Sequence, residues 1–132
     1  MSIFEDHITN HDDIVLQNYD YEFDVFDNSW VLRTKKSDFW SSGLNLTYVT
    51  AETLWKYYVH EDAVYGIKYI YGYNFKPTKK QFVEFCSKST ILYDRIVFKG
   101  QVFYQKRSLW EFFNTFNEFV VSEYMKQSFN NR

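Results

Sequence analysis

Alternation of apolar and polar residues predicts a β-hairpin near the N-terminus. Between Ile14 and Asp27 the pattern becomes that of a strand with two unlike faces, since from Tyr19 to Val25 apolar side chains occupy every second position and acids fill the positions between them. Asp27-Asn28-Ser29 has the composition of a turn, and residues 30–33 predict the returning strand. We expect one face of the first strand to carry Tyr19, Tyr21, Phe23 and Val25, and the other to carry Asp20, Glu22 and Asp24.

Two later segments also have strand patterns. Residues 65–75 alternate between aromatic or aliphatic side chains and small or polar ones, which predicts a strand with a ribbon of rings. Gly66 and Gly72 on its other face would let a helix or another chain approach closely. Residues 91–105 alternate more weakly around residues 98–101, a turn-compatible centre, and predict a second hairpin.

Three helices are predicted from apolar positions spaced three and four residues apart. The first follows Thr50, a preferred N-cap residue, and ends near residues 61–63. The other two begin with capping boxes, in which Ser or Thr is followed three residues later by Gln or Glu. These boxes are Thr78 with Gln81, starting a helix to about residue 88, and Ser108 with Glu111, starting a helix of about twenty residues.

The order of these elements predicts an α+β fold. Two β-hairpins plus one further strand form a mostly antiparallel sheet, and three helices, including a long C-terminal helix, pack on it. The length of 132 residues suits a single domain. Residues 1–13 are polar and are expected to form either a short helix or a mobile acidic arm.

The aromatic content suggests a contact surface. The chain has 14 Phe, 12 Tyr and 4 Trp, more rings than a domain of this size can bury, so some rings should be exposed. Exposed rings are common at protein interfaces. Phe39 and Trp40 lie in the middle of a polar stretch from Thr34 to Asn45, and we expect them in a contact loop.

Charge is unevenly distributed along the chain. The first 32 residues contain eight carboxylates and no Lys or Arg, whereas the remainder contains nine acids and all fifteen basic residues. Side chains two apart on a strand lie roughly 6.6–6.8 Å apart. Asp20, Glu22 and Asp24 would therefore present a line of negative charge that resembles one edge of a nucleic-acid backbone and attracts a basic surface. The alternative is a solvated face of an edge strand, where charge prevents aggregation.

Signals for catalysis, metals or cofactors are weak. The sequence contains no glycine-rich phosphate loop, nucleophile elbow or zinc-ligand cluster. His7 and His11 are four apart among carboxylates but lack a third ligand. Cys86 falls on the apolar side of its helix beside Phe82 and Phe85, where a thiol packs as a small inert hydrophobe. We therefore expect a protein that is not an enzyme, with no cofactor and no catalytic or metal-binding residues.

Composition also bears on location and source. The acidic start, the lack of a long apolar run and the single cysteine favour a cytoplasmic protein without a membrane segment or an internal disulfide. Few Ala, Gly, Arg and Pro residues beside many Phe, Tyr, Ile, Asn and Lys suggest AT-rich coding DNA. This composition is typical of a low-GC bacterium, its phages or plasmids, or an AT-rich parasite.

Our leading hypothesis is an inhibitor whose acidic N-terminal face occupies a basic, nucleic-acid-binding surface of another protein. The partner would be a nuclease, a nucleic-acid-binding effector or a toxin, as for a phage or plasmid counter-defence inhibitor or a toxin-immunity protein. A homodimer joined through the two charged ends is an open alternative. The predicted partner-binding residues are Asp12, Asp13, Asp20, Glu22, Asp24, Asp27, Phe39 and Trp40.

The second hypothesis is a nucleic-acid-binding regulator. Basic residues lie among rings in residues 76–107, and such mixtures can bind single strands by stacking and charge. Residues from about 77 to 113 also loosely resemble the winged helix-turn-helix of small phage excisionases and regulators. The resemblance uses the helix at Thr78, a second helix opening at Lys88-Ser89-Thr90 and a turn at Lys99-Gly100. Direct nucleic-acid binding is not our first expectation, because the acidic N-terminal segment would repel phosphates.

Overall fold

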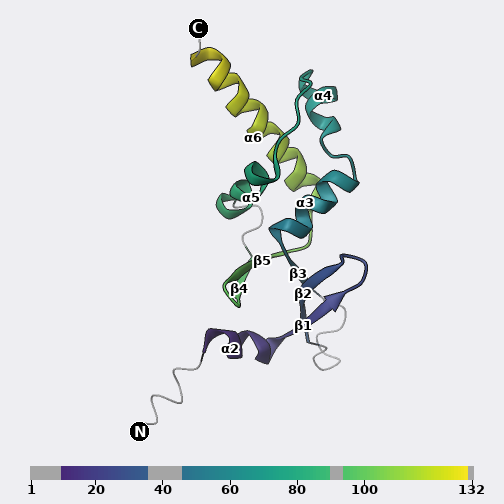
Figure 1. Ribbon diagram of the computed structural model, residues 1–132, viewed down its shortest axis with the longest axis vertical. Helices are drawn as coiled ribbons and strands as arrows, with labels where there is room; N and C mark the ends of the chain where they lie inside the picture. The colour runs from purple at the N-terminus through teal and green to yellow at the C-terminus, as the bar shows by residue number, and fades with distance from the viewer. Residues whose placement is uncertain (1–9, 36–45, 90–93, 131–132) are drawn as a thin grey trace. The chain divides into compact units, whose positions relative to one another are not determined.

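The computed structural model describes residues 10–35, 46–89 and 94–130 (Figure 1). Within these ranges it contains five helices and five strands, which confirms the α+β class and the long C-terminal helix. The described residues group into a sheet unit, from residues 10–35, 46–50 and 94–106, and a helical unit, from residues 51–89 and 107–130. The assignment of residues 1–132 to one domain stays a prediction. Of residues 1–13, predicted to form a short helix or a mobile arm, residues 1–9 lie outside the described residues, and residues 11–13 begin helix α2 (His11–Asn18).

The sheet unit contains a five-stranded antiparallel sheet with strand order β1-β2-β3-β5-β4. Both predicted hairpins are confirmed, as β1–β2 and β4–β5. The further strand is β3, a segment for which the sequence pattern predicted no strand. The strands are β1 (Tyr19–Asp24), β2 (Ser29–Thr34), β3 (Thr47–Thr50), β4 (Arg95–Phe98) and β5 (Gln101–Gln105).

The two edges of this sheet approach each other around a small aromatic core. The ring of Tyr21 on edge strand β1 lies 4.9 Å from the ring of Phe98 on the opposite edge strand β4. Helix α2 (His11–Asn18) contacts both strands and contributes the buried side chain of Val15. A helix that covers sheet edges in this way protects them from pairing with other chains.

The predicted strand from Ile14 is wrong in its first five residues, which belong to α2. The side chain of Asn10 caps this helix and accepts a hydrogen bond from the backbone N–H of Asp12 at 2.8 Å. Asp12 and Asp13 lie in the first turn, where carboxylates are favourable. The cap and the first-turn acids therefore favour a helix more strongly than the β-branched residues Ile14 and Val15 favour a strand.

The helical unit is built around rings. Its helices are α3 (Ala51–His60), α4 (Tyr65–Tyr71), α5 (Lys79–Lys88) and α6 (Leu109–Asn130). Three of them, α3, α5 and α6, confirm predicted helices. In the capping box of α5, the side chains of Thr78 and Gln81 each accept a hydrogen bond from the backbone N–H of the other residue. The buried ring of Tyr58 lies 5.3–5.5 Å from the rings of Phe82, Phe113 and Phe116.

The start of α6 differs from its prediction in one respect. Ser108 has a φ of 52°, whereas a capping residue ordinarily has an extended backbone. The phenylalanine stripe of the predicted helix is buried nevertheless, at Phe112, Phe113 and Phe116.

The strand predicted for residues 65–75 is wrong, because this segment forms α4 and a connection after it. Gly66 lets α6 approach, since a Cβ atom there would lie 2.7 Å from Nδ2 of Asn117. A helix does approach this glycine closely, but Gly66 lies on a helix and not on the strand for which the approach of a helix or another chain was predicted. Gly72 ends α4 in the left-handed conformation, with φ of 77°, and its N–H donates to the carbonyl of Lys68 at 2.9 Å, as in an αL cap.

Candidate partner-binding surface

The structure places the six predicted acids in the sheet unit, whereas Phe39 and Trp40 lie outside the described residues. Two acids lie in the first turn of α2, three lie on β1 and one lies in the turn that follows β1. In this order they are Asp12 and Asp13; Asp20, Glu22 and Asp24; and Asp27.

The acidic line is shorter than predicted. Asp13, Asp20 and Glu22 are exposed, but Asp24 and Asp27 are only 8% and 5% exposed. The interpretation of Asp24 and Asp27 as exposed partner contacts is therefore wrong, because both carboxylates have partners inside the sheet unit.

Asp24 fixes the turn and the neighbouring strand. Its Oδ1 accepts a hydrogen bond from the backbone N–H of Asp27 at 2.8 Å, and its other oxygen pairs with the guanidinium of Arg33 on β2. The hydrogen bond from Asp27 and the nearby Arg33 hold the pKa of Asp24 below its ordinary value of 3.8. The same guanidinium also pairs with Glu22, and these contacts raise the pKa of Arg33.

Asp27 anchors the same turn to the residue that follows β5. The Lys106 ammonium donates to Oδ1 and Oδ2 of Asp27 at 3.2 and 3.3 Å, directly after β5. Asn28 follows with φ of 51°, a left-handed conformation that asparagine tolerates better than most residues. Asp24 and Asp27 thus position the turn instead of offering charge to a partner.

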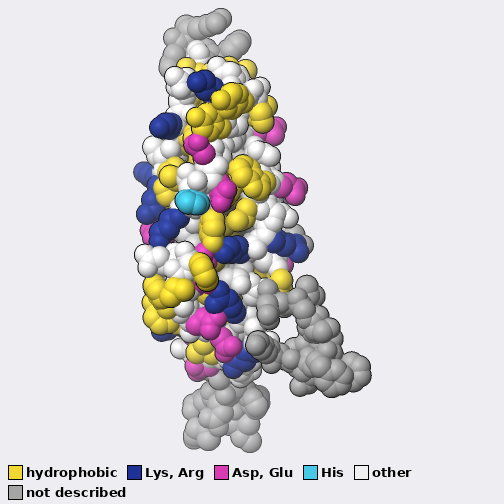
Figure 2. Space-filling model, turned by 90° about the vertical axis from the view of Figure 1, so that its right-hand side faces the viewer, with side chains coloured by type: hydrophobic (Ala, Val, Ile, Leu, Met, Phe, Trp, Pro, Cys, Tyr) yellow, Lys and Arg dark blue, Asp and Glu magenta, His cyan; other side chains and the backbone are white. Residues whose placement is uncertain are grey.

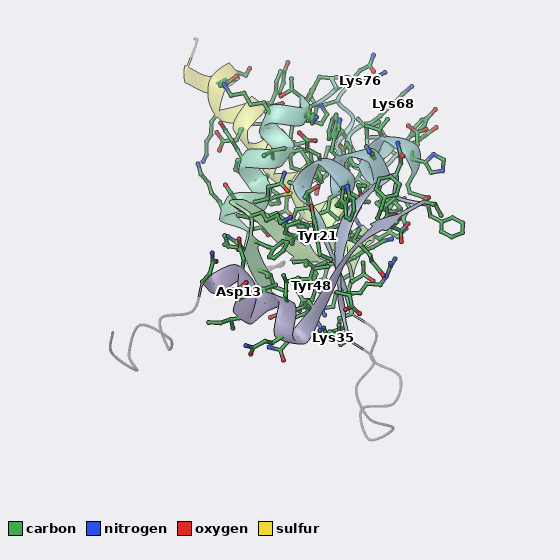
Figure 3. The ribbon with its side chains drawn as sticks, turned by 60° about the horizontal axis from the view of Figure 1, so that its bottom comes forward. Asp13, Tyr21, Lys35, Tyr48, Lys68 and Lys76 are labelled. Carbon is green, nitrogen blue, oxygen red and sulfur yellow. The ribbon has the colours of Figure 1, made fainter. Side chains whose placement is uncertain are left out.

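The turn displays an apolar surface, which we call the hairpin tip: Phe23, Val25, Phe26 and Trp30. Phe26 is 95% exposed and Val25 is 76% exposed, while Phe23 and Trp30 are about half exposed. Phe23 and Trp30 are directly opposite each other, with ring centroids 5.8 Å apart. The ring of Tyr21, a residue labelled in Figure 3, stacks on Trp30 at 4.8 Å. Rings gathered at an exposed turn are typical of a binding surface.

The alternation of β1 did not reveal the hairpin tip, because it places Phe23 and Val25 on the same face as Tyr19 and Tyr21, which are partly buried. Two signals in the sequence could have revealed it. Val25 and Phe26 are apolar residues beside the polar turn residues Asp27 and Asn28. The chain also has more rings than its cores can bury.

Charge around the hairpin is mixed. Glu22 is paired with Arg33, and Oδ1 of Asp12 accepts a hydrogen bond from the backbone N–H of Lys99 at 3.1 Å. The Lys99 ammonium lies 4.9 Å from the centre of the Tyr21 ring. Figure 2 shows acidic side chains beside basic ones on the face that is drawn. The exposed negative charge of Asp20 and Glu22 is thus limited to β1 and has basic groups close to it.

Several cations of the basic segment have partners within their own unit. Lys79 pairs with Glu52 at 3.3 Å, and the guanidinium of Arg95 lies over the ring of Tyr104. The second helix of the winged-helix pattern does not open at Lys88-Ser89, because α5 continues to Lys88 and Ser89 is extended.

Three further findings concern a metal site, a membrane-spanning helix and the cysteine. No group of three or more His, Cys, Asp or Glu side chains in residues 10–35, 46–89 and 94–130 is arranged to hold a metal ion. In the same ranges, no helix combines the length and apolar character needed to span a bilayer. Cys86 is fully buried on α5, as predicted.

In comparisons with known proteins, this chain matches no family model, no curated protein and no solved structure.

The depressed pKa of Asp24 predicts a pH-dependent stability. A lowered pKa in the folded state means that ionised Asp24 stabilises the fold above about pH 3.8, and this contribution is lost as pH falls through the folded pKa. We expect Asp24→Asn to be less stable than wild type at neutral pH, with the difference shrinking on acidification. Urea unfolding at about pH 7 and about pH 3 measures this. The exposed Asp20→Asn is the control, and an equal Asp24→Asn deficit at both pH values would contradict the assigned role.

Proposed function

We propose that this chain is a non-enzymatic protein-binding inhibitor whose β1–β2 hairpin occupies a basic surface of a partner protein. The observation that carries the proposal is the hairpin tip, where Phe26 is 95% exposed on a turn fixed by partly buried ion pairs. Rings that become buried at the centre of an interface contribute most of its binding energy. The fixed turn also lowers the entropy that is lost on binding.

The positions of the charges suggest how the hairpin meets its partner. Asp20 and Glu22 alternate along β1 with Tyr21 and Phe23, so the acids and the rings lie on opposite faces of the hairpin. A partner that contacts both faces must surround the hairpin. We therefore propose that the tip inserts into a cleft with an apolar floor and a basic wall, as is found where a protein binds an acidic chain.

A nuclease, a nucleic-acid-binding effector or a toxin is the proposed class of partner, because such proteins have basic clefts. A phage or plasmid counter-defence inhibitor, or an immunity protein for a toxin, would act in this way. This part of the proposal rests on the acidic first quarter of the chain and on its composition, which suggests an AT-rich genome. A regulator that binds nucleic acid directly has less support, since Lys79, Arg95 and Lys106 of the basic segment are engaged within the protein.

Affinity capture of the tagged protein from its native host tests the proposal, with and without nuclease treatment. We expect a basic protein that is retained after nuclease treatment and is lost when the bait carries Phe26→Ser. Co-purified nucleic acid with no protein retained after nuclease treatment would favour the regulator. Capture of only a second copy of the chain would favour the homodimer.

Removing the exposed acids should change the rate of association. The double variant Asp20→Asn with Glu22→Gln loses two charges and the exposed ion pair of Glu22 with Arg33, but little shape, so its melting temperature should be close to that of wild type. Association with the captured partner should slow by about three- to tenfold at low salt and depend less on salt. Stopped-flow measurements at two salt concentrations check this. Glu84→Gln with Glu118→Gln, two exposed acids of the helical unit, is the matched control. If the double variant associates at the wild-type rate, Asp20 and Glu22 do not belong to the interface.

A further inference from the structure

A groove in the helical unit is independent of the hairpin. It consists of two adjoining cavities of about 230 and 170 Å³, which share Asp62, Val64 and Lys76 in their walls. Their remaining walls come from α3, from α4 and from the connection between α4 and α5. Because the cavities share three residues, a single small ligand could occupy both.

The two halves of the groove differ in chemistry. The smaller half is lined by Trp55, Tyr58 and Pro77 and is mainly apolar. The larger half is mainly polar, and it contains the ammonium-bearing side chains of Lys68 and Lys76. A ligand that fills both halves must combine a flat apolar ring with an anionic group.

The walls of the groove are held in place. After the Gly72 cap, the chain runs to Pro77, which is buried. The rings of Tyr73 and Phe75 contact the ring of Tyr124 on α6, with centroids 5.3 and 4.7 Å away. Anchored walls of this kind suit a pre-formed site, as most small-molecule sites are.

The lysines of the larger half are available to an anion. Figure 3 shows Lys68 and Lys76 near each other on α4 and on the segment before α5. Both side chains are exposed, and among the described residues neither has a carboxylate within ion-pair distance. Asp62 is the acid that lines both halves, so the two lysines leave the groove with a net positive charge.

We propose that this groove binds a nucleoside phosphate. The base would lie against Trp55 in the apolar half, and the phosphate would contact Lys68 and Lys76. Asp62 would accept hydrogen bonds from sugar hydroxyls or from an amino group of the base. An inorganic anion would leave the apolar half unused, and a neutral ring would leave the lysines unused. The cavities are small beside those of drug-sized ligands, which indicates one nucleotide.

Such a ligand has two sources, a free mononucleotide or the phosphorylated end of a single strand. Calorimetric titrations of the full chain with AMP, adenosine, inorganic phosphate and a short 5′-phosphorylated single strand distinguish them. We expect AMP to bind at least about tenfold more tightly than adenosine or phosphate, because only AMP occupies both halves. Lys68→Gln and Lys76→Gln should each weaken AMP binding by about five- to tenfold.

Lys80→Gln, an exposed lysine of α5 that does not line the groove, is the matched control and should bind AMP like wild type. A single strand that binds more tightly than AMP and is equally sensitive to the two lysine variants would assign the same site to a strand end. No AMP or strand binding, equal binding of adenosine and AMP, or wild-type affinity in both lysine variants would overturn the proposal. These results are independent of the hairpin, because Phe26 belongs to the sheet unit.

Discussion

Phe116→Ala is expected to lower the free energy of unfolding by about 3–5 kcal/mol, a large part of the stability of a small protein. Phe116 is fully buried on α6. Its ring centroid lies 5.0 Å from that of Phe82, 5.3 Å from that of Tyr58 and 5.4 Å from that of Phe85. Alanine would remove these contacts and leave a cavity that the surrounding rings cannot easily fill, since rings have few alternative packings.

Chemical denaturation followed by circular dichroism measures this loss. Phe119→Ala is the control, because Phe119 lies on the same helix but is 41% exposed, so its truncation should cost clearly less. If Phe116→Ala unfolds at the same denaturant concentration as wild type, the aromatic stripe of α6 does not form the core of the helical unit.

The parts of the fold that the sequence predicted are specified by local signals. The capping box at Thr78 and Gln81 is complete within four residues, and the stripe at Phe112, Phe113 and Phe116 is a helical repeat. The hairpin β1–β2 likewise follows from alternation beside turn residues. Such elements can be located without knowledge of what packs on them.

The segments that the sequence predicted wrongly depend on distant contacts or on competing signals. Residues 65–75 alternate like a strand, but Gly66 faces Asn117, a residue of α6 that is far away in the sequence. Asn117 also accepts a hydrogen bond from the Tyr58 hydroxyl and donates to the carbonyl of Ala63. These buried contacts hold the residues at the start of α4 against α6, and no periodicity within the segment could indicate them.

The candidate site was predictable in part. The alternation places the acids of β1 on one face of the strand, but it cannot show that Asp24 and Asp27 are buried and paired with Arg33 and Lys106. Lys106 is 79 residues from Asp27, so their pairing depends on the fold of the whole sheet unit. The hairpin tip, in contrast, could have been predicted from the sequence, because Val25 and Phe26 are apolar residues next to a polar turn.

Phe26→Ser is expected to weaken partner binding by about 30-fold or more, which corresponds to about 2 kcal/mol. Phe26 is the most exposed large apolar side chain among the described residues, at 95%, so an inserted hairpin would bury a whole ring that is now in water. The same exposure means that the fold does not depend on this ring. The variant should therefore keep the melting temperature of wild type while its complex dissociates faster.

The dissociation constant of the captured partner for Phe26→Ser, measured beside wild type and Tyr69→Ser, tests the central claim most directly. Tyr69 is 75% exposed on α4 in the helical unit, so its replacement is a matched change of an exposed ring outside the hairpin. We predict a loss of about 30-fold or more for Phe26→Ser, near-wild-type affinity for Tyr69→Ser and equal melting of all three proteins. Wild-type affinity in Phe26→Ser would contradict the account, because the partner would then bind without the hairpin tip.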